Sequence, residues 1–200
     1  MAEAPPLVLN LPARFEPVRH IRSTLLMSSY ASIRDAGYDA AYRAALAPQH
    51  QATIFEAVAG TWIPIEVAVA HYDACATLGL SHDAQLALGR LAGAKIQATI
   101  LGTAVRMARE AGVTPWTAMP HFQRFWNRAF DGGGLLIEKR GPKEVHMEVH
   151  RAANADCIYW RAALSGLGTG LLELFCRKAY MRETTRTRVP GFATFRIQWA

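Results

Sequence analysis

The sequence predicts an α+β fold in which helices pack on a small antiparallel sheet of about four strands. Its clearest strand is 144–150, where Glu and His alternate with Val and Met, as expected of a strand with one buried face. Two long runs, 65–78 and 83–111, have apolar residues at helical spacing. The expected order is a series of helices, a hairpin, one further helix and a second hairpin, which is typical of the α+β class.

The first half of the chain predicts helices that are separated by glycine and proline. An extended turn is expected at Thr61–Pro64, because a residue that precedes proline avoids the α region. Gly89 and Gly93 are four residues apart and therefore lie on one helix face, which predicts a close contact with another element. The expected helices are 18–35, 38–46, 49–59, 65–78 and 83–111.

The second half predicts an aromatic helix, two hairpins and one apolar helix. The aromatic helix is expected within 115–131, with its regular part beginning near Pro120. The apolar run contains Arg161 and Glu173, so we expect a buried helix and no membrane span. The expected strands are 135–139, 144–150, 180–188 and 192–199, with the apolar helix at 157–178.

The composition is that of one globular domain. Of 200 residues, 51% are hydrophobic and 19% are charged, which excludes global disorder. We expect a single domain over 18–200, preceded by an irregular leader over 1–17. The leader lacks a basic stretch followed by a long apolar run, and is therefore not typical of a secretory signal.

Positive charge is concentrated near the end of the sequence. The formal net charge is +6, and residues 177–196 contain six basic residues and one acidic residue. This segment predicts either a solvated strand face or a surface for an acidic protein partner. The residues that would meet such a partner are Arg182, Arg186 and Arg188, and we expect no nucleic acid.

The three cysteines, Cys75, Cys157 and Cys176, have no CxxC spacing. Their odd number excludes a complete disulfide framework and favours reduced thiols in a cytoplasmic protein. His71 lies one helical turn before Cys75, so its imidazole can approach the thiol. The two interpretations are a reactive thiol and a small core cysteine.

Histidine spacing does not predict a metal site. His146 and His150 lie on one face of the same strand but about 13 Å apart along it. We therefore expect a polar strand face and no bound metal, and the alternative is a metal shared by His146, Glu148 and a third ligand from elsewhere. The sequence also lacks a P-loop, a GxSxG elbow, an HExxH helix and zinc-finger spacing.

Aromatic residues predict an apolar ligand pocket between helices and sheet, with simple core packing as the alternative. Arg124 is the candidate contact for an acidic head group, with an ordinary exposed helix charge as its alternative. The candidate lining residues are Trp62, Cys75, Trp116, Phe122, Trp126 and Tyr159.

Short motifs distributed over residues 18–199 resemble those of one protein family. They are Thr61-Trp62-Ile63-Pro64-Ile65-Glu66, Leu88-Gly89-Arg90, Thr114-Pro115-Trp116, Phe130-Asp131-Gly132-Gly133 and Phe195-Arg196-Ile197-Gln198-Trp199. Together they resemble an uncharacterised myxobacterial paralogous family. That family is distantly similar to vinyl-four-reductase domains, haem-NO-binding-associated domains and TRAPP-type trafficking subunits.

The resemblance implies a vinyl-four-reductase-like fold, often dimeric, with an apolar pocket between helices and sheet. TRAPP-type proteins can carry an acyl chain on a cysteine. The metal-binding cysteines of vinyl-four-reductase domains are replaced here by Thr184, Thr185, Ala193 and Thr194, so no metal is expected. No cofactor is expected either.

We therefore expect a non-catalytic sensory or regulatory domain that binds an apolar small molecule. Burial of the ligand would contribute about 25 cal/mol per Å² before entropic costs. One alternative is a dimeric interaction scaffold with no ligand. The other is an enzyme that acts on an apolar or tetrapyrrole-like substrate through His71 and Cys75.

Overall fold

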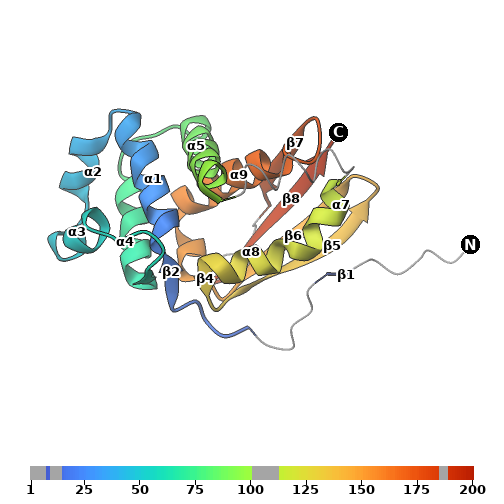
Figure 1. Cartoon of the computed structure of the whole chain (residues 1–200), viewed down its shortest axis with the longest axis horizontal. Helices are drawn as coiled ribbons and strands as arrows, with labels where there is room; N and C mark the ends of the chain where they lie inside the picture. The colour runs from blue at the N-terminus through green and yellow to red at the C-terminus, as the bar shows by residue number, and fades with distance from the viewer. Residues whose placement is uncertain (1–7, 10–14, 101–112, 185–188) are drawn as a thin grey trace, which may run out of the picture.

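The computed structural model describes residues 8–9, 15–100, 113–184 and 189–200, with the backbone alone for 8–9 and 96–100. Helices form one end of the molecule, and a twisted sheet with its own helices forms the other (Figure 1). The α+β fold expected from the sequence is confirmed. In the described part of the chain, every helix is too short or too polar to cross a lipid bilayer.

The helical end is built from the first hundred residues. Its centre is α4 (Ile65–Ala76), which contacts α2, α3 and, from the second half of the chain, residues 153–172. Pro48 begins α3 at a position where its missing N–H costs nothing. The remaining helices are α1 (Ser23–Asp35), α2 (Asp39–Ala45), α3 (Pro48–Phe55) and α5 (His82–Ile100).

The main sheet has five strands in the order β1-β5-β6-β8-β7, and all neighbours are antiparallel. The alternation at 144–150 places Val145, Met147 and Val149 on the buried face. The Met181 amide of the edge strand donates to the Thr169 hydroxyl at 3.2 Å, so a helix side chain covers this edge. The strands are β1 (Val8–Leu9), β5 (Gly134–Gly141), β6 (Glu144–His150), β7 (Ala179–Glu183) and β8 (Ala193–Trp199).

A second, three-stranded sheet joins the two ends of the molecule. Its order is β3-β2-β4, with β2 (His20–Arg22) between β3 (Trp62–Pro64) and β4 (Phe130–Asp131). Ile21 pairs with Ile63 on one side and with Phe130 on the other. The expectation of a helix from residue 18 is therefore wrong, because these long-range pairings hold residues 20–22 extended.

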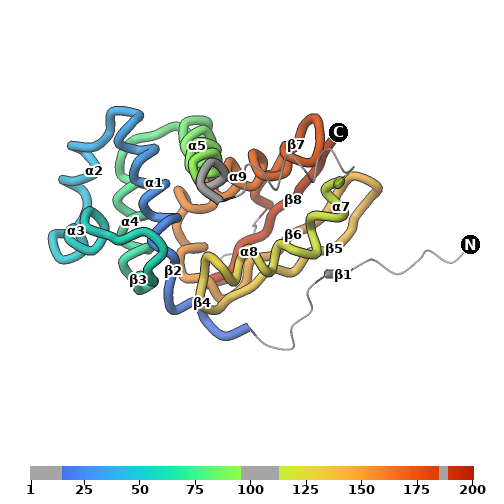
Figure 2. Tube along the Cα trace, viewed as in Figure 1, coloured from blue at the N-terminus to red at the C-terminus, as the bar shows by residue number. Residues whose placement is uncertain are grey.

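Helix α9 (Ile158–Leu172) packs on the main sheet and against α5 (Figure 2). A Cβ on Gly89 would lie 2.1 Å from the Ala163 carbonyl oxygen, and one on Gly166 would lie 2.0 Å from the Leu86 carbonyl oxygen. The glycines thus allow the two helix backbones to approach closely, as predicted for Gly89. Gly168 on the same helix faces the sheet, since a Cβ there would lie 2.3 Å from the Met181 sulfur of β7.

Three other expectations about element boundaries are corrected. Helix α3 ends at Phe55 and α9 ends at Leu172, earlier than expected. The aromatic region divides into α7 (Pro115–Ala118), the 3-10 turn η1 (Met119–His121) and α8 (Phe122–Ala129), since Pro120 interrupts regular helix hydrogen bonding. The part of the predicted 83–111 helix beyond Ile100 lies outside the described residues.

The leader contributes to the sheet. Val8 and Leu9 pair with Glu138 and Ile137 of β5. The Phe15 ring occupies the space that a side chain on residue 134 would fill, and it stacks on His150. Part of the segment that was expected to be irregular is therefore an edge strand.

Candidate functional site

Two of the predicted lining residues meet inside the helical end. The Tyr72 ring, on α4, stacks on Tyr159 of α9 with ring centres 6.4 Å apart. Cys75 is also fully buried, and its Sγ atom lies 3.8 Å from His71 Nε2. Cys75 and Tyr159 thus belong to one interior cluster at the contact between α4 and α9.

His71 is the centre of a buried hydrogen-bond network. The Tyr42 hydroxyl lies 2.5 Å from His71 Nδ1, and the Ser29 hydroxyl lies 2.9 Å from Nε2. Desolvation lowers the pKa of His71 to about 3, so the ring is neutral at physiological pH. One ring nitrogen then donates and the other accepts, and both are engaged.

This environment does not activate the Cys75 thiol. Burial raises its pKa well above the usual value, and a neutral imidazole supplies no charge to stabilise a thiolate. The predicted approach of His71 to Cys75 is present, but its chemistry is that of a packed core. The enzyme hypothesis based on this pair loses its main physical support.

The other predicted aromatic residues are distributed over the molecule. The Trp126 indole donates to the Gly132 carbonyl at 2.8 Å and stacks on Phe130 in the interior. The Trp116 indole donates to the Pro142 carbonyl at 2.7 Å. Trp62 is 40% exposed on β3, far from α7 in Figure 2. These residues do not converge on one pocket.

Two predicted residues lie on α8. Phe122 is half-buried and makes an edge contact with Phe125. Arg124 is exposed, and it lies about 200° around the helix from the buried Trp126. Arg124 therefore points away from the interior that Trp126 lines, and its alternative interpretation as a surface charge fits the structure.

A residue that the sequence did not single out stands at the junction of the two ends. Asn154 lies in the 3-10 turn η2 (Ala153–Asp156), which contacts both α4 and α9. Its side chain has no exposed surface, and neither its amide nitrogen nor its amide oxygen has a hydrogen-bond partner among the described residues. In a sequence, an Asn after a strand signals only a turn, so nothing there marks it as buried.

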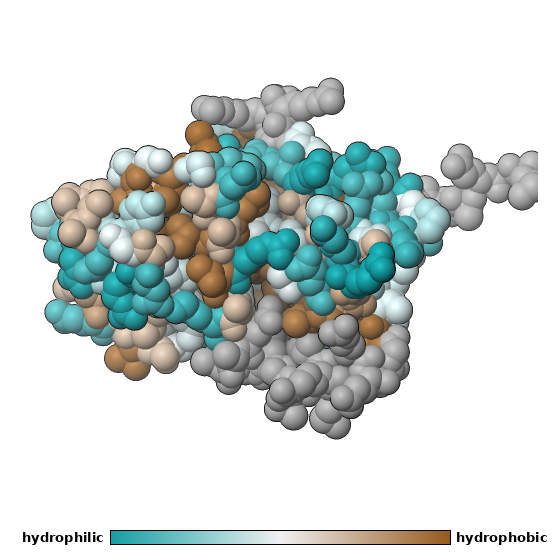
Figure 3. Space-filling view, turned by 90° about the horizontal axis from the view of Figure 1, so that it is seen from above, coloured by the Kyte–Doolittle hydropathy of each residue, from teal (hydrophilic) through white to brown (hydrophobic). Residues whose placement is uncertain are grey.

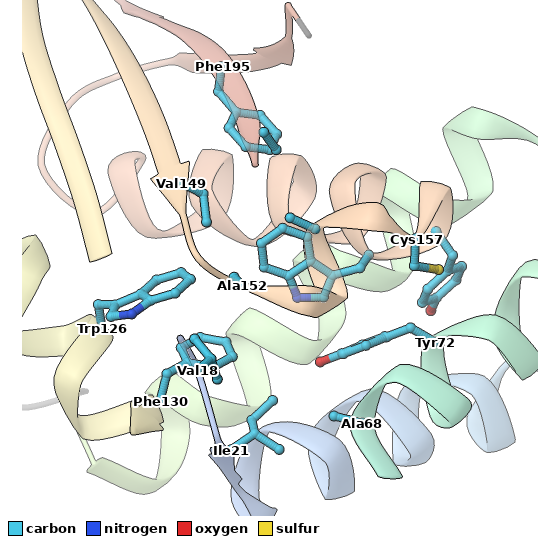
Figure 4. Close-up of a cluster of buried hydrophobic side chains, with 14 of the residues drawn as sticks. Val18, Ile21, Ala68, Tyr72, Trp126, Phe130, Val149, Ala152, Cys157 and Phe195 are labelled. Carbon is cyan, nitrogen blue, oxygen red and sulfur yellow. The ribbon is translucent and has the colours of Figure 1, made fainter. Parts of the chain in front are cut away.

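The junction is lined by apolar side chains from both ends of the molecule. Figure 4 shows Tyr72 extending from α4 toward Ala152, with Val18, Trp126 and Phe130 on the opposite side. All five residues belong to the main buried cluster. Asn154 follows Ala152 by two residues, in the turn that contacts α4 and α9.

The outer face of the main sheet is polar and slightly hollowed. Figure 3 shows hydrophilic residues over the described surface at the sheet end of the molecule, and apolar patches toward the helical end. Glu148 lies 2.8 Å from His150 and 3.5 Å from His146. Within the described residues, no group of three or more His, Cys, Asp or Glu side chains is placed to share a metal ion.

No family model and no curated protein matches the chain. Solved structures do match, and the similarity covers 90% of the chain. The Fe(II) unliganded H-NOX protein from K. algicida has 11% identity and a TM-score of 0.57, with 97% of its chain covered. A Cs H-NOX mutant with 4-cyano-L-phenylalanine at site 5 has 12% identity and a TM-score of 0.57, with 96% covered. The chain has an H-NOX-like fold.

The H-NOX family contains heme, and a heme needs a protein side chain as an axial ligand to its iron. Heme iron takes a ligand such as a neutral histidine or a thiolate. Both nitrogens of the buried His71 are engaged, and the Cys75 thiol is held protonated. Residues 101–112, outside the described ranges, contain neither histidine nor cysteine. Neither His71 nor Cys75 is therefore placed to bind a heme iron.

Proposed function

We propose that this chain is a non-catalytic sensory or regulatory domain that binds a small, uncharged, largely apolar molecule at the junction of its helical and sheet ends. The observation that carries the proposal is the buried Asn154 amide, which has no partner among the described residues. An unsatisfied buried donor or acceptor costs about 1–3 kcal/mol. A bound molecule that meets both atoms would offset that cost.

The ligand class follows from the surroundings of Asn154. The helix α4, which η2 contacts, lies in an interior that disfavours charge, since burial lowers the pKa of His71 and raises that of Tyr72. An ionised carboxylate is therefore a poor occupant, and the acidic head group considered for Arg124 is replaced by a neutral one. A primary carboxamide or a lactam can donate to Oδ1 and accept from Nδ2 at once.

Binding at a packed junction supplies a mechanism for signal output. Val18 and Ala152 are buried there beside Tyr72, so a ligand enters only when the two ends of the molecule shift slightly apart. Occupancy and shape are then coupled, because the ligand stabilises the shifted form alone. A cytoplasmic location, a homodimer that transmits the shift and a relationship to vinyl-four-reductase domains are parts of this proposal.

The test is native mass spectrometry of the chain purified from its native host, repeated under denaturing conditions. We expect an extra mass of a few hundred daltons that is lost on denaturation. Retained mass would indicate a covalent adduct, with Cys75 the first residue to map, and would contradict non-covalent binding. Protein with no extra mass in either condition would contradict the proposal and favour the interaction scaffold.

We propose, as a second function, an interaction scaffold without a ligand. It would contact an acidic protein through Arg182, Arg186 and Arg188. Arg182 is exposed on β7 and supports it. Arg186 and Arg188 lie outside the described residues. Retention of an acidic protein by the purified wild-type chain, and its loss from Arg182→Glu, would be the expected result.

A further inference from the structure

Four side chains form a compact block on the outer face of β7 and β8. Arg182 is directly opposite Arg196 in the antiparallel pair. Two residues further along, the Thr184 amide donates to the Thr194 carbonyl at 2.8 Å, and the two threonine hydroxyls lie 3.1 Å apart. Residues two apart in a strand lie on the same face. Two guanidinium groups and two hydroxyl groups are therefore neighbours.

The like charges of Arg182 and Arg196 are compensated only in part, because Glu144 pairs with Arg196 and not with Arg182. Like charges directly opposite each other in a sheet are destabilising. Arg182 forms no salt bridge with the described residues, and the adjacent Glu183 is bound to Arg161 at 2.7 Å. The Arg182 guanidinium has only a distant contact, 5.8 Å from the Tyr180 ring centre.

Arg196 is held in place by Glu144 and still has unused N–H donors. Its Nε and Nη2 atoms donate to the two Glu144 oxygens at 2.9 and 2.7 Å. Gln198 also donates to Glu144, at 2.8 Å, which fixes the carboxylate that holds the guanidinium. A guanidinium has five N–H donors, so three remain for another acceptor.

A hollow lies beside this block. Its volume is about 330 Å³, at the lower end of the range for small-molecule sites. Arg196, Thr184 and Thr194 of the block line it together with Arg140 and His146, whereas Arg182 does not. The lining residues are Arg140, Glu144, Val145, His146, Thr184, Thr194 and Arg196.

We propose that this hollow binds the phosphate group of a small phosphomonoester. A phosphate presents acceptor oxygens in several directions and a charge near −2, which matches two arginines and two hydroxyl groups better than a single carboxylate does. The site is on the opposite face of the sheet from the junction at Asn154, so it does not depend on the function proposed above. Glu144 also lines the hollow and weakens the attraction, so we expect micromolar rather than nanomolar affinity.

The probe is phenyl phosphate, titrated calorimetrically into the full chain, with benzoate as the carboxylate comparison. We expect saturable binding of phenyl phosphate and at least tenfold weaker binding of benzoate. Arg140→Gln and Thr194→Val, which change two residues that line the hollow, should each weaken phenyl phosphate binding at least fivefold. Arg128→Gln, which removes an equal charge from α8, should leave it unchanged, and far-ultraviolet circular dichroism verifies that each variant is folded.

Three results would overturn the proposal. Equal loss from Arg140→Gln and Arg128→Gln would mean attraction by net charge alone. Absence of saturable binding to the wild-type chain would remove the site. Tighter binding of an oligoglutamate peptide than of phenyl phosphate, and its loss from Arg182→Gln, would assign the block to an acidic protein.

Discussion

His71 and Asn154 are both polar side chains with no exposed surface. They differ in whether their polar atoms have hydrogen-bond partners. His71 is bound on both ring nitrogens by Tyr42 and Ser29. Neither polar atom of the Asn154 amide has a partner among the described residues. A satisfied buried polar group specifies a core, whereas an unsatisfied one calls for an explanation such as a bound molecule. The comparison indicates that His71 stabilises the core, whereas Asn154 is a candidate ligand-binding residue.

The largest expected effect comes from breaking the satisfied network. His71→Leu leaves the Tyr42 and Ser29 hydroxyls without their partner in the core, at about 1–3 kcal/mol for each unsatisfied group. We expect the free energy of unfolding in urea to fall by about 2–5 kcal/mol. A loss below about 1 kcal/mol would mean that the network does not stabilise the helical end.

The next effect concerns the packing that positions α9 beside the junction. Gly166→Ala forces a Cβ to within 2.0 Å of the Leu86 carbonyl oxygen, and such overpacking costs about 1–3 kcal/mol. Gly170→Ala is the matched control on the same helix, because nothing lies within 4 Å of its added Cβ. We expect the control to be neutral or up to about 1 kcal/mol more stable. Equal thermal stability of the two variants would contradict the close α5–α9 contact.

The pH dependence of the free energy of unfolding measures the contribution of His71. Its folded-state pKa is about 3, below the unfolded value of about 6.5, so the unfolded chain binds one more proton between these values. Stability from this residue is complete above about pH 6.5 and is lost as the pH falls, at about 1.4 kcal/mol per pH unit.

The measurement is urea unfolding between pH 5 and 6.5, a window above the titration of Asp39 and Glu144, whose carboxyl pKa values are lowered. His71→Asn should lower the slope of unfolding free energy against pH by about 1.4 kcal/mol per pH unit, which corresponds to one proton. An unchanged slope in this variant would show that His71 is already protonated in the folded chain.

The smallest effect, and the one of opposite sign, is expected at Asn154. Asn154→Leu removes a desolvated amide and keeps a similar volume, so ligand-free protein should be unchanged or up to about 1 kcal/mol more stable. Chemical unfolding of wild type and variant, both refolded from urea to remove any ligand, measures the difference. A loss above about 2 kcal/mol would indicate that the amide has partners in solution and is structural, like His71.

The sequence predicted the elements whose signal is local. The alternation from Glu144 to His150 gave a strand with its faces correctly assigned, and Gly89 predicted a close helix contact. Strand β2 was missed because three residues carry no usable period, and Ile21 is held extended by partners more than 40 positions away. Local periodicity cannot report such a pairing.

The candidate site was predictable only in part, for a related reason. Cys75 and Tyr159 share one interior cluster, since each lies on the apolar face of a helix, and their role as ligand lining stays a prediction. Trp62 and Arg124 have the residue types of a binding site, yet both are exposed, and exposure depends on packing that no single segment specifies. Asn154 has the composition of an ordinary turn, and only the three-dimensional contacts of η2 with α4 and α9 bury it.

The central claim is that the Asn154 amide holds a ligand at the junction, and native mass spectrometry of wild type and Asn154→Leu, both purified from the native host, tests it most directly. We predict an extra mass on the folded wild-type protein that is absent from the folded variant. The same extra mass on both proteins would place the ligand elsewhere and contradict the role of Asn154.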